Sequence, residues 1–139
     1  MTNLIIDASV AVKWLLKEKD SQAAIRLLDG KHYLLAPDLI RAEFANVIWK
    51  QQLHGALSKS ESMEILRQFL RAPLEILASD MILEEALSLA IQTRRTVYDC
   101  TYLALAVHKE CKMVTADERL VNSLQQSRWA ENIYLLGLD

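Results

Sequence analysis

Four acidic residues lie at positions where a carboxylate is suited to chemistry. Asp7 directly follows the apolar run LII, and Asp117 directly follows the run MVTA. Asp99 opens the stretch DCTYLALAV, which is apolar almost throughout, and Glu43 lies beside the inward stripe of the helical pattern PDLIRAEFANVIWK. A charge beside such apolar stretches is costly without a partner, so Asp99 and Glu43 need a cation or hydrogen-bond donors.

Carboxylates that converge repel one another unless a positive charge lies among them. The three histidines, His32, His54 and His108, are scattered, and no cysteine or histidine has the spacing of a zinc site. We therefore expect a hard divalent cation, Mg²⁺ or Mn²⁺, which binds carboxylate and water oxygens. Such an ion polarises a phosphoryl oxygen and helps to form hydroxide from water, which is the chemistry of phosphodiester hydrolysis.

Polar neighbours accompany these acids. Ser9, Thr101 and Thr115 lie two residues from Asp7, Asp99 and Asp117 respectively, where their hydroxyls can orient a carboxylate or the waters of a metal ion. Asn46 lies one helical turn after Glu43 and is expected to support it.

An ordinary structural role remains open for each of these residues. Each aspartate can be a helix N-cap, whose side chain accepts backbone N–H groups. Glu43 can instead pair with Arg41 or Lys50 at the edge of the apolar stripe. The hydroxyl side chains can make local capping and turn hydrogen bonds.

The elements that carry these residues are short and apolar. We expect strands at 4–6, 33–36, 74–77, 113–115 and 133–136, alternating with helices near 10–16, 21–29, 39–53, 58–70, 80–92, 99–107 and 120–124. Strands that are apolar throughout are typical of a sheet covered on both faces. The sequence thus predicts an α/β fold, a three-layer sandwich with a short, mostly parallel sheet of about five strands. Ligands bind such sheets beyond the carboxyl ends of the strands.

The bulk composition fits one globular domain spanning residues 1–139. The chain is 52% hydrophobic and 24% charged, and its net charge of -2 argues against a strongly basic nucleic-acid coat. If one helix joins Cys100 to Cys111, roughly 16 Å separate them, too far for a disulfide, so we expect free thiols in a reducing cytosol. We expect neither a signal peptide nor a membrane span, and a cytoplasmic protein.

Four motifs in order, IIDASV, AEFANVIW, YDCTYLALA and VTADERL, resemble the PIN-domain family, and within it the VapC-type toxins of toxin–antitoxin pairs. The resemblance covers nearly the whole chain. It implies a metal-dependent ribonuclease that acts on RNA. It also implies a small cognate antitoxin protein, whose basic or apolar segment would cover the acidic site, and either a homodimer or a hetero-oligomer with that antitoxin.

The motifs carry roles over residue by residue. The resemblance implies that Asp7, Asp99 and Asp117 are metal ligands, that Glu43 is a ligand or a water-orienting base, and that Ser9 and Thr115 are the hydroxyls that accompany the first and last acids. Many relatives have a further acid two residues after the last aspartate, where this chain has Arg119. We therefore expect one firmly held ion and a phosphate-binding role for Arg119.

Two other functions are compatible with parts of the pattern. A phosphatase of the haloacid dehalogenase type would use Asp7 as a nucleophile, but such enzymes usually have a second aspartate where this chain has Ser9. A non-catalytic module that binds RNA or protein would gain nothing from clustered negative charge near phosphates. Candidates for steering RNA are Lys13, Lys17, Arg94, Arg95, Lys109 and Lys112, although each can instead be a solvated surface charge. Candidates for apolar contact surfaces are Trp14, Trp49 and Trp129, although each can instead pack in the core.

Overall fold

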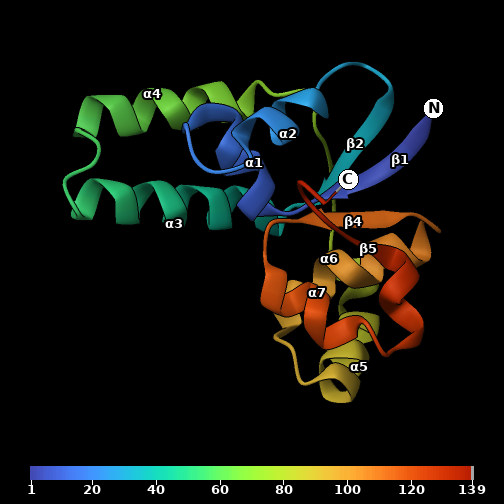
Figure 1. The fold of residues 1–139 in the computed structure, drawn as a ribbon. Helices are drawn as coiled ribbons and strands as arrows, with labels where there is room; N and C mark the ends of the chain where they lie inside the picture. The colour runs from blue at the N-terminus through green and yellow to red at the C-terminus, as the bar shows by residue number, and fades with distance from the viewer. Residues whose placement is uncertain (139) are drawn as a thin grey trace.

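The computed structural model describes residues 1–138, in which five strands form a single parallel sheet (Figure 1). The strand order is β3-β2-β1-β4-β5, and every neighbouring pair is parallel. This confirms the predicted sheet. The strands are β1 (Thr2–Ile6), β2 (His32–Pro37), β3 (Glu75–Leu77), β4 (Lys112–Thr115) and β5 (Ile133–Leu135).

The expected helices all form, with shifts of a few residues at their ends. One difference affects the site: the apolar helix begins at Val97, two residues before Asp99, because the Thr96 side chain caps it. The helices are α1 (Ala8–Leu15), α2 (Ser21–Arg26), α3 (Leu39–Leu53), α4 (Lys59–Leu70), α5 (Leu83–Thr93), α6 (Val97–His108) and α7 (Glu118–Leu124), with 3₁₀ turns η1 (Asp80–Ile82) and η2 (Arg128–Asn132).

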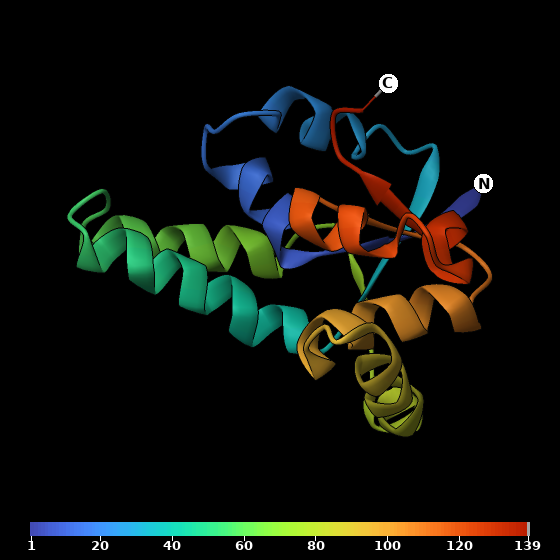
Figure 2. The ribbon, with the colours of Figure 1, turned by 60° about the horizontal axis from the view of Figure 1, so that its bottom comes forward.

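Helices cover both faces of the sheet, as the apolar strands predict. In the view of Figure 1, α1, α2 and α4 lie above the sheet, and α5, α6 and α7 lie below it. The hairpin of α3 and α4 extends away from the sheet (Figures 1 and 2). The α6 helix packs against β1, β2 and β4, while α5 packs on the outer side of α6. The three-layer sandwich is thus confirmed.

The core lies on both sides of β1 and β4, the central strands. Residues 100–106 of α6 are all buried, which explains why that helix is apolar around its whole circumference. On the other side, the rings of Phe44 and Phe69 stack with their centroids 4.0 Å apart and join α3 to α4. Within residues 1–138, Cys100 and Cys111 are free thiols, as expected. No helix in that range is long and apolar enough to cross a membrane.

The three tryptophans have different settings. Trp14 packs on the core and its indole N–H donates to the Ala24 carbonyl at 2.9 Å. Trp129 is half-buried, and the Arg128 guanidinium lies 4.7 Å from its ring centroid. Trp49 is 54% exposed on α3. Core packing therefore accounts for Trp14, and Trp49 keeps its predicted role as a surface contact.

Candidate active site

Asp7 is a buried carboxylate at the end of the central strand. Its backbone N–H donates to the Val114 carbonyl, which extends the pairing of β1 with β4. Its side chain does not cap α1, so the N-cap alternative is wrong for this residue. Instead, Oδ2 of Asp7 accepts hydrogen bonds from Thr115 Oγ1 at 2.7 Å and from Ser9 Oγ at 2.9 Å. The two predicted hydroxyls therefore hold Asp7 in place.

The same two hydroxyls connect Asp7 to the loop after β4. Ser9 Oγ accepts from the Ala116 N–H at 3.0 Å, and Thr115 Oγ1 accepts from the Asp117 N–H at 3.1 Å. Each hydroxyl accepts one hydrogen bond from this loop and donates one to Asp7. Both hydroxyls therefore have a partner for the proton and a partner for the oxygen. The network fixes the position of Asp7 relative to the backbone of Asp117.

Asp117 and Asp99 differ in how their carboxylates are used. Asp117 is the N-cap of α7, and its Oδ1 accepts from the Leu120 N–H at 3.1 Å, so the capping alternative holds for one of its oxygens. Asp99 is the third residue of α6, where Thr96 is the cap and accepts from the Asp99 N–H at 3.0 Å. The carboxylate of Asp99 therefore has no capping role.

Thr101 takes the local alternative. Its hydroxyl donates to the Val97 carbonyl, one helical turn earlier, at 2.7 Å. Because the hydroxyl has one proton and donates it to Val97, Thr101 does not donate to the carboxylate of Asp99.

Glu43 lies half-buried in the second turn of α3 and is held by a residue that sequence reasoning missed. The hydroxyl of Tyr102, on α6, donates to Oε1 of Glu43 at 2.5 Å. Tyr102 is 1% exposed, and a buried tyrosine hydroxyl needs a partner; that need was the signal available in the sequence. Asn46 is exposed, and no hydrogen bond joins it to Glu43 within residues 1–138, so the expected support from Asn46 is absent there.

The four acids influence one another electrostatically. Burial raises the pKa of Asp7, and the charge of Asp99 raises it further. Burial also raises the pKa of Glu43, and both Asp7 and Asp99 add to the rise. For Asp99, burial and the charge of Asp117 raise the pKa. The structure therefore brings the four predicted acids into one region, where their charges repel.

Burial, together with the charges of Asp7 and Glu43, raises the pKa of Tyr102 far above that of a free tyrosine. Tyr102 therefore stays protonated and acts as a fixed hydrogen-bond donor to Glu43.

The acids do not form a closed cage. Across residues 1–138, no three side chains of histidine, cysteine, aspartate or glutamate come together closely enough to hold an ion by themselves. This is compatible with Mg²⁺, which keeps several of its waters and uses one or two carboxylates together with substrate phosphates. The donors at hand are carboxylate and hydroxyl oxygens, which are ligands for a hard cation.

The comparisons with known proteins agree with this arrangement. The sequence model of the PIN domain family matches residues 4–122. The chain belongs to the PIN domain family. A relative is Ribonuclease VapC3 of Pyrobaculum aerophilum, which is 33% identical over 120 residues covering 84% of this chain and 91% of the relative.

Solved structures share the PIN fold of this chain. PAE2754 from Pyrobaculum aerophilum has a TM-score of 0.70 at 22% identity, covering 95% of this chain and 83% of that one. VapBC2 from Rickettsia felis, bound to a DNA fragment from its promoter, gives 0.66 at 14% identity over 96% and 98% of the two chains. VapC20 of Mycobacterium tuberculosis, a toxin that cleaves the sarcin–ricin loop, gives 0.64 at 13% identity over 83% and 90%.

The basic residues of this PIN domain differ in the groups that they contact. The Lys13 ammonium contacts Glu18 at 3.3 Å and donates to the Lys19 carbonyl at 2.8 Å. Lys112 donates to the Glu131 carbonyl at 3.0 Å. These two lysines are therefore engaged elsewhere and are poor candidates for steering RNA.

Two arginines lie nearer to the acids. The charge of Arg95 lowers the pKa of Asp99, and its Nε is buried without a hydrogen-bond partner in the described chain. Arg119 is exposed in the first turn of α7, two residues after Asp117. The charge of Arg95 thus acts on Asp99, while the phosphate-binding role of Arg119 stays a prediction. Lys17, Arg94 and Lys109 are exposed on the surface.

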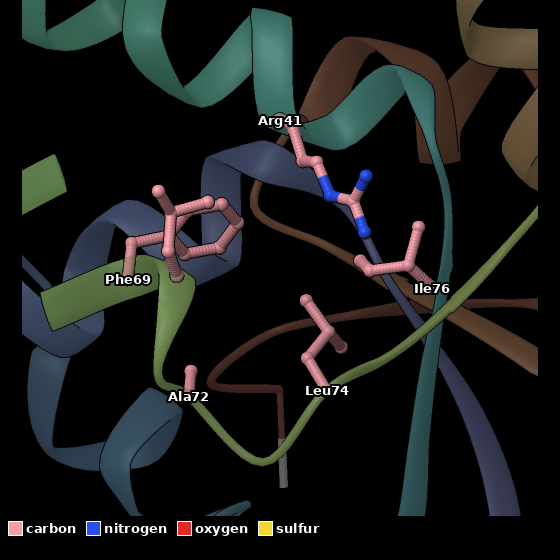
Figure 3. Close-up of a pocket in the computed structure, with 6 residues that line it drawn as sticks. Arg41, Phe69, Ala72, Leu74 and Ile76 are labelled. Atoms are coloured by element: carbon pink, nitrogen blue, oxygen red, sulfur yellow. The ribbon is translucent and has the colours of Figure 1, made fainter. Parts of the chain in front are cut away.

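A separate pocket lies away from the four acids. It has a volume of about 440 Å³ and is lined by Arg41, Phe69, Leu70, Ala72, Leu74 and Ile76 (Figure 3). The Arg41 side chain extends toward Ile76 and Leu74, so one guanidinium borders an otherwise apolar wall. Because none of the four acids lines this pocket, it is not part of the candidate active site.

Proposed function

We propose that this chain is a metal-dependent endoribonuclease that hydrolyses RNA phosphodiester bonds and is the toxin of a toxin–antitoxin pair. The observation that carries the proposal is the buried carboxylate of Asp7, which two hydroxyls orient beside the charges of Asp99 and Glu43. A merely structural residue here would gain by being neutral, because burial of an uncompensated charge is costly. The sequence similarity to Ribonuclease VapC3 also supports RNA hydrolysis as the reaction.

Asp7, Asp99 and Asp117 would hold one Mg²⁺ or Mn²⁺ ion, in part through water. Bound there, the ion would polarise the phosphoryl oxygens and favour the formation of hydroxide. The raised pKa values of Asp7 and Asp99 support this assignment, because a cation would remove the repulsion that contributes to them.

The remaining residues would position the reactants. Glu43, held by Tyr102, would orient the attacking water and accept its proton. Ser9 and Thr115 would keep the Asp7 carboxylate directed at the reaction centre. Arg119 and Arg95 would bind the phosphates on either side of the cleaved bond.

The proposed partner is a small antitoxin that covers the acids with a basic or apolar segment. One structural neighbour is a toxin–antitoxin complex from Klebsiella pneumoniae, with a TM-score of 0.62 at 10% identity, over 94% of this chain and 95% of that one. We propose that residues 1–139 act as one nuclease domain in the cytoplasm, either as a homodimer or bound to the antitoxin.

The ends of the RNA products test the reaction. Attack by water with departure of the 3′ oxygen leaves a 3′ hydroxyl and a 5′ phosphate, whereas attack by the ribose 2′ hydroxyl leaves a 2′,3′-cyclic phosphate. We expect purified protein to cut total RNA at a limited set of internal sites and to leave 5′ phosphates, which ligation-based mapping of the ends detects. Cyclic phosphate ends would contradict the mechanism, and RNA that is bound but uncut would favour the non-catalytic module.

Tyr102→Phe tests the positioning of Glu43. The substitution keeps the buried ring and removes the hydroxyl that donates to the Glu43 carboxylate. We expect kcat to fall by about tenfold with KM nearly unchanged, since Glu43 acts on water rather than on RNA binding. Tyr134→Phe is the control, because the Tyr134 hydroxyl donates to the exposed Leu138 carbonyl and, among residues 1–138, to none of the four acids. Equal activity of both variants would contradict the role of Tyr102.

A further inference from the structure

Tyr98 presents an aromatic ring to solvent beside one of the four acids. The residue is 62% exposed and directly precedes Asp99 in the first turn of α6. The Cα atoms of neighbouring residues are about 3.8 Å apart, so a nucleotide bound at Asp99 lies within reach of the Tyr98 ring. Tyr98 is not part of the hydrophobic core, and its ring is therefore available to a ligand.

The Tyr98 ring lies on the side of α6 that faces Glu43. Tyr98 and Tyr102 are four residues apart, so they share one side of the helix. The Tyr102 hydroxyl reaches Glu43 on α3 from that side, and Figure 2 shows the start of α6 beside the start of α3. Because long side chains on a helix lean toward its N-terminus, the Tyr98 ring projects one turn beyond the buried Tyr102 ring. Tyr98 is thus at the outer edge of the acids.

Positive charge comes directly before this ring in the chain. Arg94 and Arg95 precede Tyr98 by four and three residues, and neither forms an ion pair within residues 1–138. Their charges are available to the phosphates of RNA, which the acids alone would repel. An aromatic ring next to cationic side chains is typical of sites that bind unpaired nucleic acid, where the cations contact phosphates and the bases stack on the ring.

We propose that Tyr98 stacks on an unpaired base of the RNA and thereby positions the nucleotide next to the cleaved bond. The proposal rests on the proposed function, because it takes RNA to be the ligand of the acids. Every base has a flat aromatic face, so this contact does not read the sequence. It does require an unpaired base, because in a duplex both faces of each base are covered by the neighbouring base pairs.

Three variants isolate the contribution of the ring. Tyr98→Ala removes the ring, whereas Tyr98→Phe keeps it and removes only the hydroxyl. Tyr33→Ala is the matched control, because Tyr33 is 56% exposed but lies near the start of β2, at the opposite end of the sheet from the acids. Both tyrosines are largely exposed, so we expect every variant to keep the circular dichroism spectrum and melting temperature of wild type.

The first test is binding of RNA in EDTA, followed by fluorescence anisotropy of a labelled single strand of about 12 nucleotides that cannot pair with itself. We expect the dissociation constant to rise about tenfold in Tyr98→Ala and to stay within about twofold of wild type in Tyr98→Phe and Tyr33→Ala. The same strand annealed to its complement should bind wild type and Tyr98→Ala equally. Unchanged binding of the single strand by Tyr98→Ala, or an equal loss in Tyr33→Ala, would overturn the proposal.

The salt dependence of the same binding separates stacking from charge. A stacked ring neutralises no phosphate, so Tyr98→Ala should weaken binding by the same factor at every salt concentration. The slope of the logarithm of the binding constant against the logarithm of salt concentration should therefore equal that of wild type. A shallower slope in Tyr98→Ala would mean that the substitution disturbs phosphate contacts and would contradict a role in stacking.

A second copy of this chain is another group that could cover the ring. Sedimentation equilibrium of wild type and Tyr98→Ala tests this alternative. We expect the two proteins to associate equally. Weaker association of Tyr98→Ala together with wild-type affinity for the single strand would assign the ring to a protein contact and refute the proposal.

Abasic nucleotides identify the stacked base. In an RNA with a mapped cleavage site, removal of the base that stacks on Tyr98 should raise the RNA concentration for half-maximal single-turnover cleavage about tenfold in wild type. In Tyr98→Ala the same abasic nucleotide should have almost no further effect, because the contact is already lost. Additive effects at every position near the cleaved bond would rule out the contact.

The two tests separate this proposal from the proposed function. Binding that depends on the Tyr98 ring, in a protein that cuts no RNA with Mg²⁺ or Mn²⁺ present, would refute the nuclease and leave the stacking contact standing. Cleavage that is equally efficient in wild type and Tyr98→Ala at low RNA concentration would refute the stacking contact and leave the nuclease standing.

Discussion

Asp7→Asn is expected to lower the rate of RNA cleavage by roughly 10³-fold while leaving the fold intact. Asparagine has the shape of aspartate, and its carbonyl oxygen can still accept from Thr115 and Ser9. What the variant loses is the charge that attracts the cation. Single-turnover cleavage of a mapped RNA site, with Mg²⁺ or Mn²⁺ supplied, measures the effect.

Asp38→Asn is a matched control for this prediction. Asp38 follows the end of β2 much as Asp7 follows β1, but it is exposed and its carboxylate accepts a hydrogen bond from Ser79. We expect activity within about twofold of wild type for this variant. Full activity of Asp7→Asn with metal present would refute the assignment of Asp7.

The same substitution has a consequence for stability. Burial and the charge of Asp99 disfavour the charged form of Asp7, as its raised pKa records. Removing that charge should therefore leave the free energy of unfolding at neutral pH equal to or above that of wild type in the absence of metal. We therefore expect the variant to be much less active than wild type but no less stable. This combination is typical of substitutions at residues that serve function rather than folding.

The sheet could be predicted from the sequence because its strands are buried on both faces. Runs such as LII and MVTA have no polar alternation, and helical patterns separate them, so a parallel α/β sheet was the simplest fold that could bury them. That topology also sets Asp7 and Asp117 at the carboxyl ends of adjacent strands, β1 and β4. The strand pattern thus predicted that both aspartates lie at one edge of the sheet, but the pairing of β1 with β4, which makes them neighbours, came from the structure.

The supporting contacts were harder to predict because they depend on how helices pack. Tyr102 and Glu43 are 59 residues apart and meet only through the relative rotation of α6 and α3. Helical spacing predicted Asn46 as the polar neighbour of Glu43. Spacing along one helix cannot reveal a hydrogen-bond partner on another helix. The start of α6 depended on Thr96, a capping residue that the apolar run beginning at Cys100 did not include.

Removing divalent cations is expected to abolish cleavage and, separately, to destabilise the folded protein. Chelation with EDTA should stop the reaction, and Mg²⁺ or Mn²⁺ should restore it. Binding of the ion to the folded state should also raise the melting temperature by roughly 5–10 °C at a metal concentration about 100 times the dissociation constant. The double variant Asp7→Asn/Asp99→Asn should show no such rise, which separates specific binding from an effect of ionic strength.

The stability of the metal-free protein is expected to change with pH in a definite direction. Burial raises the pKa of Asp7, Glu43 and Asp99 above the ordinary values of 3.8 for aspartate and 4.5 for glutamate. Between those values and the raised ones, the folded protein binds more protons than the unfolded chain. The contribution of these acids to stability is thus greatest below the ordinary values and is lost as the pH rises through the raised ones.

A bound cation reverses this trend because it favours the charged carboxylates. The difference in melting temperature between protein with Mg²⁺ and protein with EDTA should therefore grow as the pH rises from about 4 to about 7. Thermal unfolding in both conditions across that range measures it. A difference independent of pH, or cleavage at full rate in EDTA, would mean that the buried acids hold no ion and that their repulsion serves some other purpose.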